Sequence, residues 1–209
     1  MQLALLFEVK PKPEAFDEYL AIAARLRPAL DELGGCLFID RFRCVREPAR
    51  ILSYQIWRDE AALVKWRVHA EHHKAQTLGR TRIFDDYRLR IAQVLHQQSV
   101  DGDWQPDRLN AYNDPTVRPP RYLAIAESRR ALAQTLGDTS SESYESLYRS
   151  GEYATVMDID QPSSAPRLTD LPGAFRVRFC ETERDYGMFD RAESPQYYPP
   201  HPLTERAVH

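Results

Sequence analysis

A tryptophan and three histidines lie close together in the segment 66–73, which reads WRVHAEHH. An indole offers a large flat apolar face for stacking on a ligand. A neutral imidazole can serve as a base or as a metal ligand near neutral pH. This combination indicates a site for a flat ligand with a titratable group beside it. The same residue types also suit a packed helix whose histidine is held by hydrogen bonds, so a purely structural role stays open.

The segment that carries these residues has the pattern of a helix. Asp59 is a suitable N-cap, the helix is expected to run to about Leu78, and Gly79 ends it. At about 100° per residue, the residues on the side of Trp66 form one stripe that faces the sheet. The other members of this stripe are Leu63, Ala70, His73 and Thr77.

The three histidines take different positions on this helical wheel. His73 lies one turn below Trp66 on the sheet-facing side. His69 lies at the edge of the stripe, and His72 points towards solvent. We therefore expect His73 to face the interior and to act as the base or the orienting group. His69 and His73 together suit a shared metal ion, but no nearby Asp, Glu or Cys completes a ligand set, so no metal site is expected.

Strands and a further helix must position this segment. Alternating apolar residues indicate a half-buried first strand, and three-to-four spacing indicates a first helix that Pro28 kinks or interrupts. Up to residue 96 we expect strands at 2–10, 36–45, 50–57 and 82–94 and helices at 14–33 and 59–78. This β-α-β-β-α-β order is that of a ferredoxin-like α+β unit. Arg88 and Arg90 alternate along the last strand and are expected to share a solvated face.

Residues 121–194 repeat the pattern in weaker form. The expected segments are a strand at 121–127 (RYLAIAE, similar to LALLFEV near the start), a helix at 128–136, a hairpin at 144–159 and a strand at 175–189. The second helix has no counterpart, because residues 160–174 contain three prolines. We expect a degenerate second ferredoxin-like unit, with a linker at 97–120 and a Pro-rich tail at 195–209. An unrelated α/β extension is the alternative.

The composition narrows the class of protein. The chain has 209 residues and a formal net charge of −3, so no basic field would attract nucleic acid or an anionic membrane. No apolar run approaches the length of a membrane span or has the form of a signal peptide. The three cysteines lack the CxxC spacing of a zinc site and do not suggest a disulfide framework. A cytoplasmic protein is expected.

The segment 53–90, SYQIWRDEAALVKWRVHAEHHKAQTLGRTRIFDDYRLR, carries a family resemblance. A strand ends in Trp57, an acidic cap follows, and the helix has the pattern W-R-x-H-x-x-H-x-x-A-Q-x-x-G-R before F-x-D-Y-R. Together with FEVKPKPEAFDEYL near the start, this resembles the antibiotic biosynthesis monooxygenase family. The resemblance implies a dimeric α+β barrel, in which two single-unit chains pair. A chain with two units is expected to close the barrel by itself or by homodimerisation.

The family resemblance implies two chemistries. One is cofactor-free oxygenation of electron-rich aromatic compounds, for which relatives carry an Asn, a Trp and a Tyr; these positions are Ser53, Trp57 and Leu63 here. The other is oxidative haem breakdown, for which relatives carry an Asn, a Trp and a His. Trp66 matches that Trp, the strand offers no Asn, and the His position is Gln76.

We accordingly expect a monooxygenase that oxygenates a small electron-rich aromatic ligand without a cofactor. The predicted catalytic residues are His73 and Trp66. The predicted substrate-binding residues are Trp57, Ser53, Leu63, His69 and Arg80. Two alternatives remain open: a haem-binding or haem-degrading protein with His73 or His69 as ligand, and a non-catalytic barrel filled by its own side chains.

Overall fold

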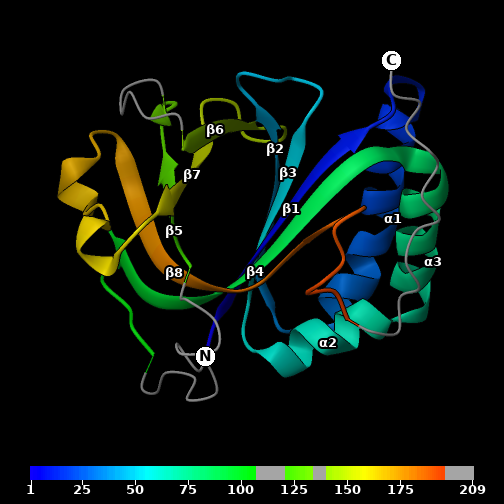
Figure 1. The fold of residues 1–209 in the computed structure, drawn as a ribbon, viewed down its shortest axis with the longest axis horizontal. Coiled ribbons are helices and arrows are strands. Elements are labelled where there is room, and N and C mark those ends of the chain that lie inside the picture. Colours follow the sequence, from blue (N-terminus) through cyan, green and yellow to red (C-terminus); the bar gives the residue numbers. More distant parts are fainter. Residues whose placement is uncertain (107–120, 134–139, 196–209) are drawn as a thin grey trace.

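The computed structural model describes residues 1–106, 121–133 and 140–195, and its eight strands form one closed barrel in the order β1-β3-β2-β6-β7-β5-β8-β4. Figure 1 shows this barrel with its helices gathered beside one part of it. The predicted α+β architecture is confirmed, and the barrel closes within the single chain. No helix in the described residues is long and apolar enough to cross a membrane.

The first half of the chain has the predicted β-α-β-β-α-β order. Its elements are β1 (Leu3–Pro11), α1 (Phe16–Leu33), β2 (Cys36–Cys44), β3 (Ile51–Trp57), α2 (Glu60–Val68), α3 (Ala70–Leu78) and β4 (Phe84–Ser99). Pro28 lies inside α1 and does not interrupt it. The second predicted helix is divided in two at His69, whose backbone is extended with ψ 130°. A π-helical turn, Gly79–Ile83, leads into β4.

The second half keeps four strands, and its described residues include no complete α-helix. Its strands are β5 (Tyr122–Ser128), β6 (Ser141–Ser146), β7 (Tyr153–Ile159) and β8 (Ala174–Gly187). The predicted helix at 128–136 is wrong over its first part, since Ser128 ends a strand and residues 129–132 are not helical. Residues 134–136 of that prediction lie outside the described residues. Only short 3-10 turns occur between β7 and β8.

The segments around the strands also differ from expectation. β4 continues to Ser99, past the predicted boundary at residue 96, and Gln97 then pairs with Trp104 in an isolated bridge. Residues 107–120 of the predicted linker lie outside the described part of the chain. The same holds for residues 196–209 of the predicted tail.

The strand register relates the two halves residue by residue. The antiparallel pairing of β1 with β4 in the first half corresponds to the antiparallel pairing of β5 with β8 in the second. The corresponding residues are Glu8 and Glu127, Arg88 and Arg176, and Arg90 and Arg178. In each half the glutamate binds the arginine two residues further along: Arg90 donates to Glu8 at 2.8 Å, and Arg178 donates to Glu127. This shared ion pair is consistent with a degenerate second copy of one unit.

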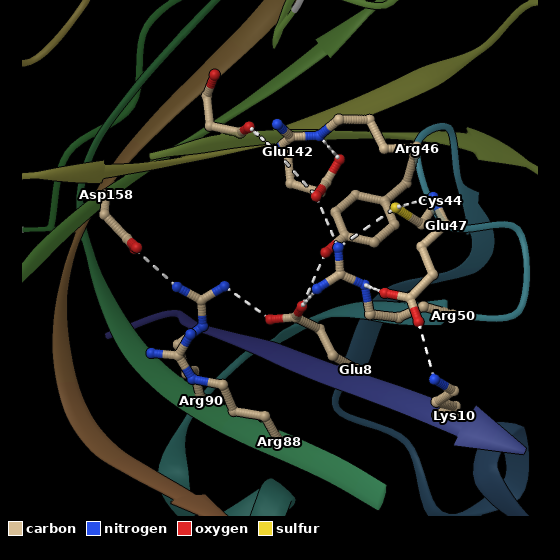
Figure 2. A network of polar contacts seen from close by, with 12 residues as sticks. Glu8, Lys10, Cys44, Arg46, Glu47, Arg50, Arg88, Arg90, Glu142 and Asp158 are labelled. Atoms are coloured by element: carbon tan, nitrogen blue, oxygen red, sulfur yellow. Dashed lines mark hydrogen bonds and ion pairs between the residues drawn. The ribbon is translucent and has the colours of Figure 1, made fainter. Parts of the chain in front are cut away.

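Buried charges lie inside the barrel and join the halves. Glu8 accepts hydrogen bonds from Arg90 and from the Tyr144 hydroxyl at 2.8 Å, and Arg90 also reaches Asp158 at 2.9 Å (Figure 2). The prediction that Arg90 is solvated is therefore wrong, because only 5% of it is exposed. The prediction that the first strand is half-buried is also wrong. The barrel interior covers the face of β1 that carries Glu8, and the helices cover its opposite face.

Candidate active site

A cavity of about 190 Å³ lies between the outer face of the first half of the barrel and helices α1, α2 and α3; we call it the helix-side cavity. Two rows of side chains that neighbour one another across the paired strands form its floor. The first row is Ile39, Gln55, Leu5 and Ile91, and the second is Arg41, Ser53, Phe7 and Leu89. Apolar side chains make up three of the four residues in the first row and two of the four in the second, so most of the floor suits an apolar ligand body.

The helices supply the opposite wall. Its residues include Tyr19, Ala23, Leu26 and Leu30 of α1, Leu63 and Trp66 of α2, and His72, Ala75 and Gln76 of α3. The three-to-four spacing of the α1 residues places them on one side of that helix. Leu30 and Trp66 pack with the cluster at one end of the cavity, and Tyr19 packs with Phe84 and Tyr87 at the other.

A chain of hydrogen bonds crosses the polar part of the floor. The Trp57 indole donates to Gln55 Oε1 at 2.9 Å, and the Gln55 amide donates to Ser53 Oγ at 3.1 Å. Ser53 and Gln55 line the cavity, whereas Trp57 is fully buried behind them. Because Ser53 Oγ already accepts a hydrogen bond, its own hydroxyl hydrogen is left to donate.

His72 is the histidine that lines the cavity. Its ring stacks on Trp66, with 4.3 Å between the centroids and 16° between the planes. Nδ1 lies 2.9 Å from the Trp66 carbonyl oxygen, which can only accept, and 3.1 Å from the side-chain amide of Gln76, which can turn its oxygen towards the ring; we therefore assign the hydrogen to Nδ1 and the lone pair to Nε2. Burial lowers the pKa of His72 to about 4. The imidazole is therefore neutral at physiological pH.

The prediction that His73 faces the interior is wrong. His73 is exposed and is not part of the cavity lining. The extended backbone of His69 breaks the helix and turns α3 relative to α2, so one continuous helical wheel no longer applies. His72, which that wheel placed towards solvent, takes the inward position.

The other predicted site residues are distributed around the cavity. Trp66, Ser53, Leu63 and Arg80 line it. Trp57 does not line it, but holds Gln55. His69 is outside the lining and stacks on Trp66 with 5.6 Å between centroids. The roles assigned to these residues remain predictions.

The charges on the cavity wall are of one sign. The lining contains five arginines: Arg27, Arg41, Arg67, Arg80 and Arg191. No aspartate or glutamate belongs to the lining among the residues that the structure describes. Within that same part of the chain no group of three His, Cys, Asp or Glu side chains is placed to hold a metal ion. The wall therefore favours an anionic ligand over a cation.

Sequence reasoning missed the contribution of the second half. Tyr186 of β8 and Arg191, four residues after the end of β8, reach the cavity of the first half. Arg191 donates to the Tyr87 hydroxyl at 2.9 Å and to the Gly187 carbonyl at 3.1 Å. Nothing in the local pattern of residues 186–191 marks them as cavity residues, because their position depends on the pairing of β8 with β4.

Three comparisons relate the chain to known proteins. The family model of antibiotic biosynthesis monooxygenase matches residues 3–78. A protein of Pyricularia oryzae named jasmonate monooxygenase is 34% identical over 215 residues, covering 94% of this chain and 98% of its own. A solved antibiotic biosynthesis monooxygenase is 22% identical and covers 44% of this chain and 96% of its own, with a TM-score of 0.39. A protein from Lactobacillus acidophilus NCFM is 8% identical and covers 88% of this chain and 95% of its own, with a TM-score of 0.43.

Proposed function

The chain belongs to the antibiotic biosynthesis monooxygenase family, and on this premise we propose that it oxygenates a small, largely apolar substrate in the helix-side cavity. The observation that carries the proposal is the lining of that cavity. Apolar side chains surround a short polar strip, with Ser53 and Gln55 on the floor and the neutral imidazole of His72 on the wall. An apolar site with a few oriented polar groups is the usual form of a small-molecule site.

In the cofactor-free scheme the substrate itself is the reductant. A CH₂ group activated by neighbouring rings loses a proton, and the resulting carbanion transfers electrons to O₂. Oxygen adds to that carbon, and loss of water leaves a carbonyl, so CH₂ and O₂ are converted to C=O and H₂O. The protein would have to bind the substrate, remove one proton and stabilise the negative charge that develops.

The cavity residues suit these tasks. His72 replaces His73 as the proposed base or orienting group, because its Nε2 keeps a lone pair and it lines the cavity. Its pKa of about 4 makes it a weak base, so the substrate CH₂ would have to be strongly acidified by its own rings. The Ser53 hydroxyl is the proposed donor to the developing oxyanion, oriented through Gln55 by Trp57. Trp66 and Leu63 would contact the apolar body. The aromatic nature of the substrate stays a prediction.

The name of the fungal relative suggests one further compound to test. That protein is named a jasmonate monooxygenase and is similar to this chain over nearly its whole length. We therefore place jasmonate beside phenolic compounds in the first substrate panel.

Haem is the alternative ligand, but the two histidines predicted to bind its iron are not placed to do so in this cavity. Neither His73 nor His69 lines the cavity. We therefore derive no step through haem. A haem titration followed by the visible spectrum tests this alternative directly, since a Soret shift that saturates would support it. The non-catalytic barrel, filled by its own side chains, is not favoured by a cavity of about 190 Å³.

Oxygen uptake with a substrate panel tests the proposed function. The variant Ala75→Phe fills the cavity from α3, and Ala61→Phe places the same ring on the exposed side of α2 as a matched control. We expect the wild type and Ala61→Phe to consume oxygen with at least one compound and Ala75→Phe to lose that turnover while keeping its fold by circular dichroism. Equal turnover in Ala75→Phe would place the reaction elsewhere.

A further inference from the structure

Arg41 presents an uncompensated positive charge to the helix-side cavity. It lies on the outer face of β2, in the floor row that contains Ser53. No carboxylate among the described residues lies within ion-pairing distance of its guanidinium, whose polar neighbours are the uncharged hydroxyls of Tyr19 and Tyr148, and its Nε is buried without a hydrogen-bond partner. The adjacent Asp40 points into the barrel, where it binds Arg149 at 2.7 Å and Ser146 at 2.8 Å. Asp40 therefore cannot neutralise Arg41.

Tyr19 presents a second unused donor at the same place. Only 7% of Tyr19 is exposed, and its buried hydroxyl lies beside the Arg41 guanidinium, which can only donate, so no acceptor in the described part of the chain takes the hydroxyl hydrogen. Burial raises the pKa of Tyr19, so the hydroxyl keeps its hydrogen. The guanidinium carbon of Arg41 lies 5.8 Å from the centroid of the Tyr19 ring. Two donors from different elements, α1 and β2, thus meet in one corner of the cavity.

The other cavity arginines with described partners differ from Arg41. Arg27 binds Asp31 at 2.8 Å and extends towards solvent, and Arg191 is held by the Tyr87 hydroxyl and a main-chain carbonyl. A buried guanidinium beside a buried hydroxyl is costly to desolvate unless an anion accepts from both. Arg41 and Tyr19 have no such anionic acceptor among the described residues, which indicates that a ligand supplies it.

We propose that Arg41 and Tyr19 form the anion-binding corner of the helix-side cavity and hold the carboxylate of a small apolar acid. This inference rests on the proposed function for the identity of the cavity as the substrate site. A carboxylate fits best because its two oxygens match the guanidinium and the hydroxyl, and its single negative charge balances the single cation. The apolar body of the acid then extends along the floor towards Trp66 and His72.

The second half of the barrel lacks this corner. β2 and β6 pair symmetrically about Arg43 and Glu145, so Ser143 occupies the position of Arg41. The Ser143 hydroxyl oxygen already accepts hydrogen bonds from the Leu132 and Ala133 main-chain amides at 3.1 and 2.9 Å. One carboxylate per chain is therefore expected rather than two.

Binding of a matched pair of probes tests the corner without requiring turnover. The probes are 1-naphthylacetate and its uncharged analogue 1-naphthylacetamide, titrated by calorimetry against the full chain. We expect the wild type to bind one equivalent of the carboxylate on the order of tenfold more tightly than the amide. Arg41→Met should weaken carboxylate binding on the order of 10- to 100-fold and leave amide binding within about twofold. Tyr19→Phe should weaken carboxylate binding by about 3- to 10-fold.

Two further variants control for charge and folding. Arg25→Met removes an exposed arginine of α1 that is not part of the cavity lining and should leave the preference unchanged. Arg41→Lys keeps the charge without the forked donor and should retain part of the preference. Each variant is checked for an unchanged melting temperature before titration.

The outcomes separate this inference from the proposed function. Carboxylate binding that depends on Arg41, without oxygen uptake on any compound, would support the corner and contradict the monooxygenase. Oxygen uptake on a panel compound, together with equal binding of the carboxylate and amide probes, would do the reverse. Equal binding of the two probes, a preference that survives in Arg41→Met, or no binding of the carboxylate by the wild type would each overturn the corner.

Discussion

The imidazole of His72 stacks on the indole of Trp66 at 4.3 Å, and the same ring is bound through Nδ1 to the Trp66 carbonyl at 2.9 Å. Trp66 thus fixes both the plane and the tautomer of the histidine. The pair brings together the two residue types that first indicated a site in the sequence. Its histidine is His72 rather than His73, because α3 starts anew after the break at His69.

Stability should depend on pH through His72. Its pKa in the fold is about 4, below the ordinary 6.5, because burial disfavours the imidazolium. The unfolded chain binds a proton as pH falls through about 6.5 while the folded chain does not, so the free energy of unfolding should fall between pH 6.5 and 4. At roughly 1.4 kcal/mol per pKa unit, the loss is up to about 3 kcal/mol.

Urea unfolding across this pH range measures the effect. His72→Phe keeps a ring on Trp66 without a titrating group and should flatten the profile. His73→Asn changes an exposed histidine of the same helix and should leave the profile as in the wild type. A slope that disappears in His73→Asn instead would contradict the assignment.

The hydrogen bond from Trp57 to Gln55 should be needed for stability. Trp57→Phe leaves Gln55 Oε1 buried without its donor, which is expected to cost about 1–3 kcal/mol. Adding Gln55→Leu removes the other partner and should restore part of that loss. Urea midpoints of the two single variants and the double variant give the coupling directly. Additive effects in this cycle would mean that the bond contributes nothing.

The buried ion pair between Arg90 and Glu8 should be far more sensitive than a surface pair. Arg90→Met removes the nearer of the two cations beside Glu8, with Arg50 remaining at 3.8 Å, and is expected to cost up to about 3–5 kcal/mol (Figure 2). Arg27→Met breaks the exposed pair with Asp31 and should cost about 0.5 kcal/mol or less. Denaturant unfolding compares the two. Similar losses in both would show that water reaches the barrel interior.

The protein should be a monomer in solution. Both seams of the barrel, β2 with β6 and β4 with β8, form within one chain, so no sheet edge is left for a second copy. Size-exclusion chromatography with light scattering should give a mass near 24.2 kDa. A stable species of twice that mass would contradict this prediction and indicate a further interface.

Much of the fold could be predicted from local patterns. The alternation at 2–10 and the three-to-four spacing at 14–33 correspond to β1 and α1, because each pattern reports which side chains an element buries. The similarity of RYLAIAE to LALLFEV also predicted a strand at 121–127, which corresponds to β5. The predicted helix at 128–136 is wrong over residues 128–132, where Ser128 ends β5 and Leu132 packs against Ala124 and Ala126 of the sheet.

The type of site and several of its lining residues were predicted from the sequence, but the positions of other residues were not. Trp66, Ser53, Leu63 and Arg80 line the cavity as expected. Trp57 and Trp66 are equally apolar, yet the strand register puts the first behind the floor while the helix puts the second on the wall. Arg90 looked solvated, because no local pattern shows that a second sheet covers its face.

The sequence by itself determined the elements, the repeated unit and the helix that carries the site, since these depend on the spacing of neighbouring residues. Only the tertiary structure decided that His72 faces the cavity, that Tyr19 meets Arg41, and that Tyr186 and Arg191 arrive from the second half. The physical reason is that one backbone angle at His69 changes the face of a helix, and strand pairing brings together residues far apart in the chain.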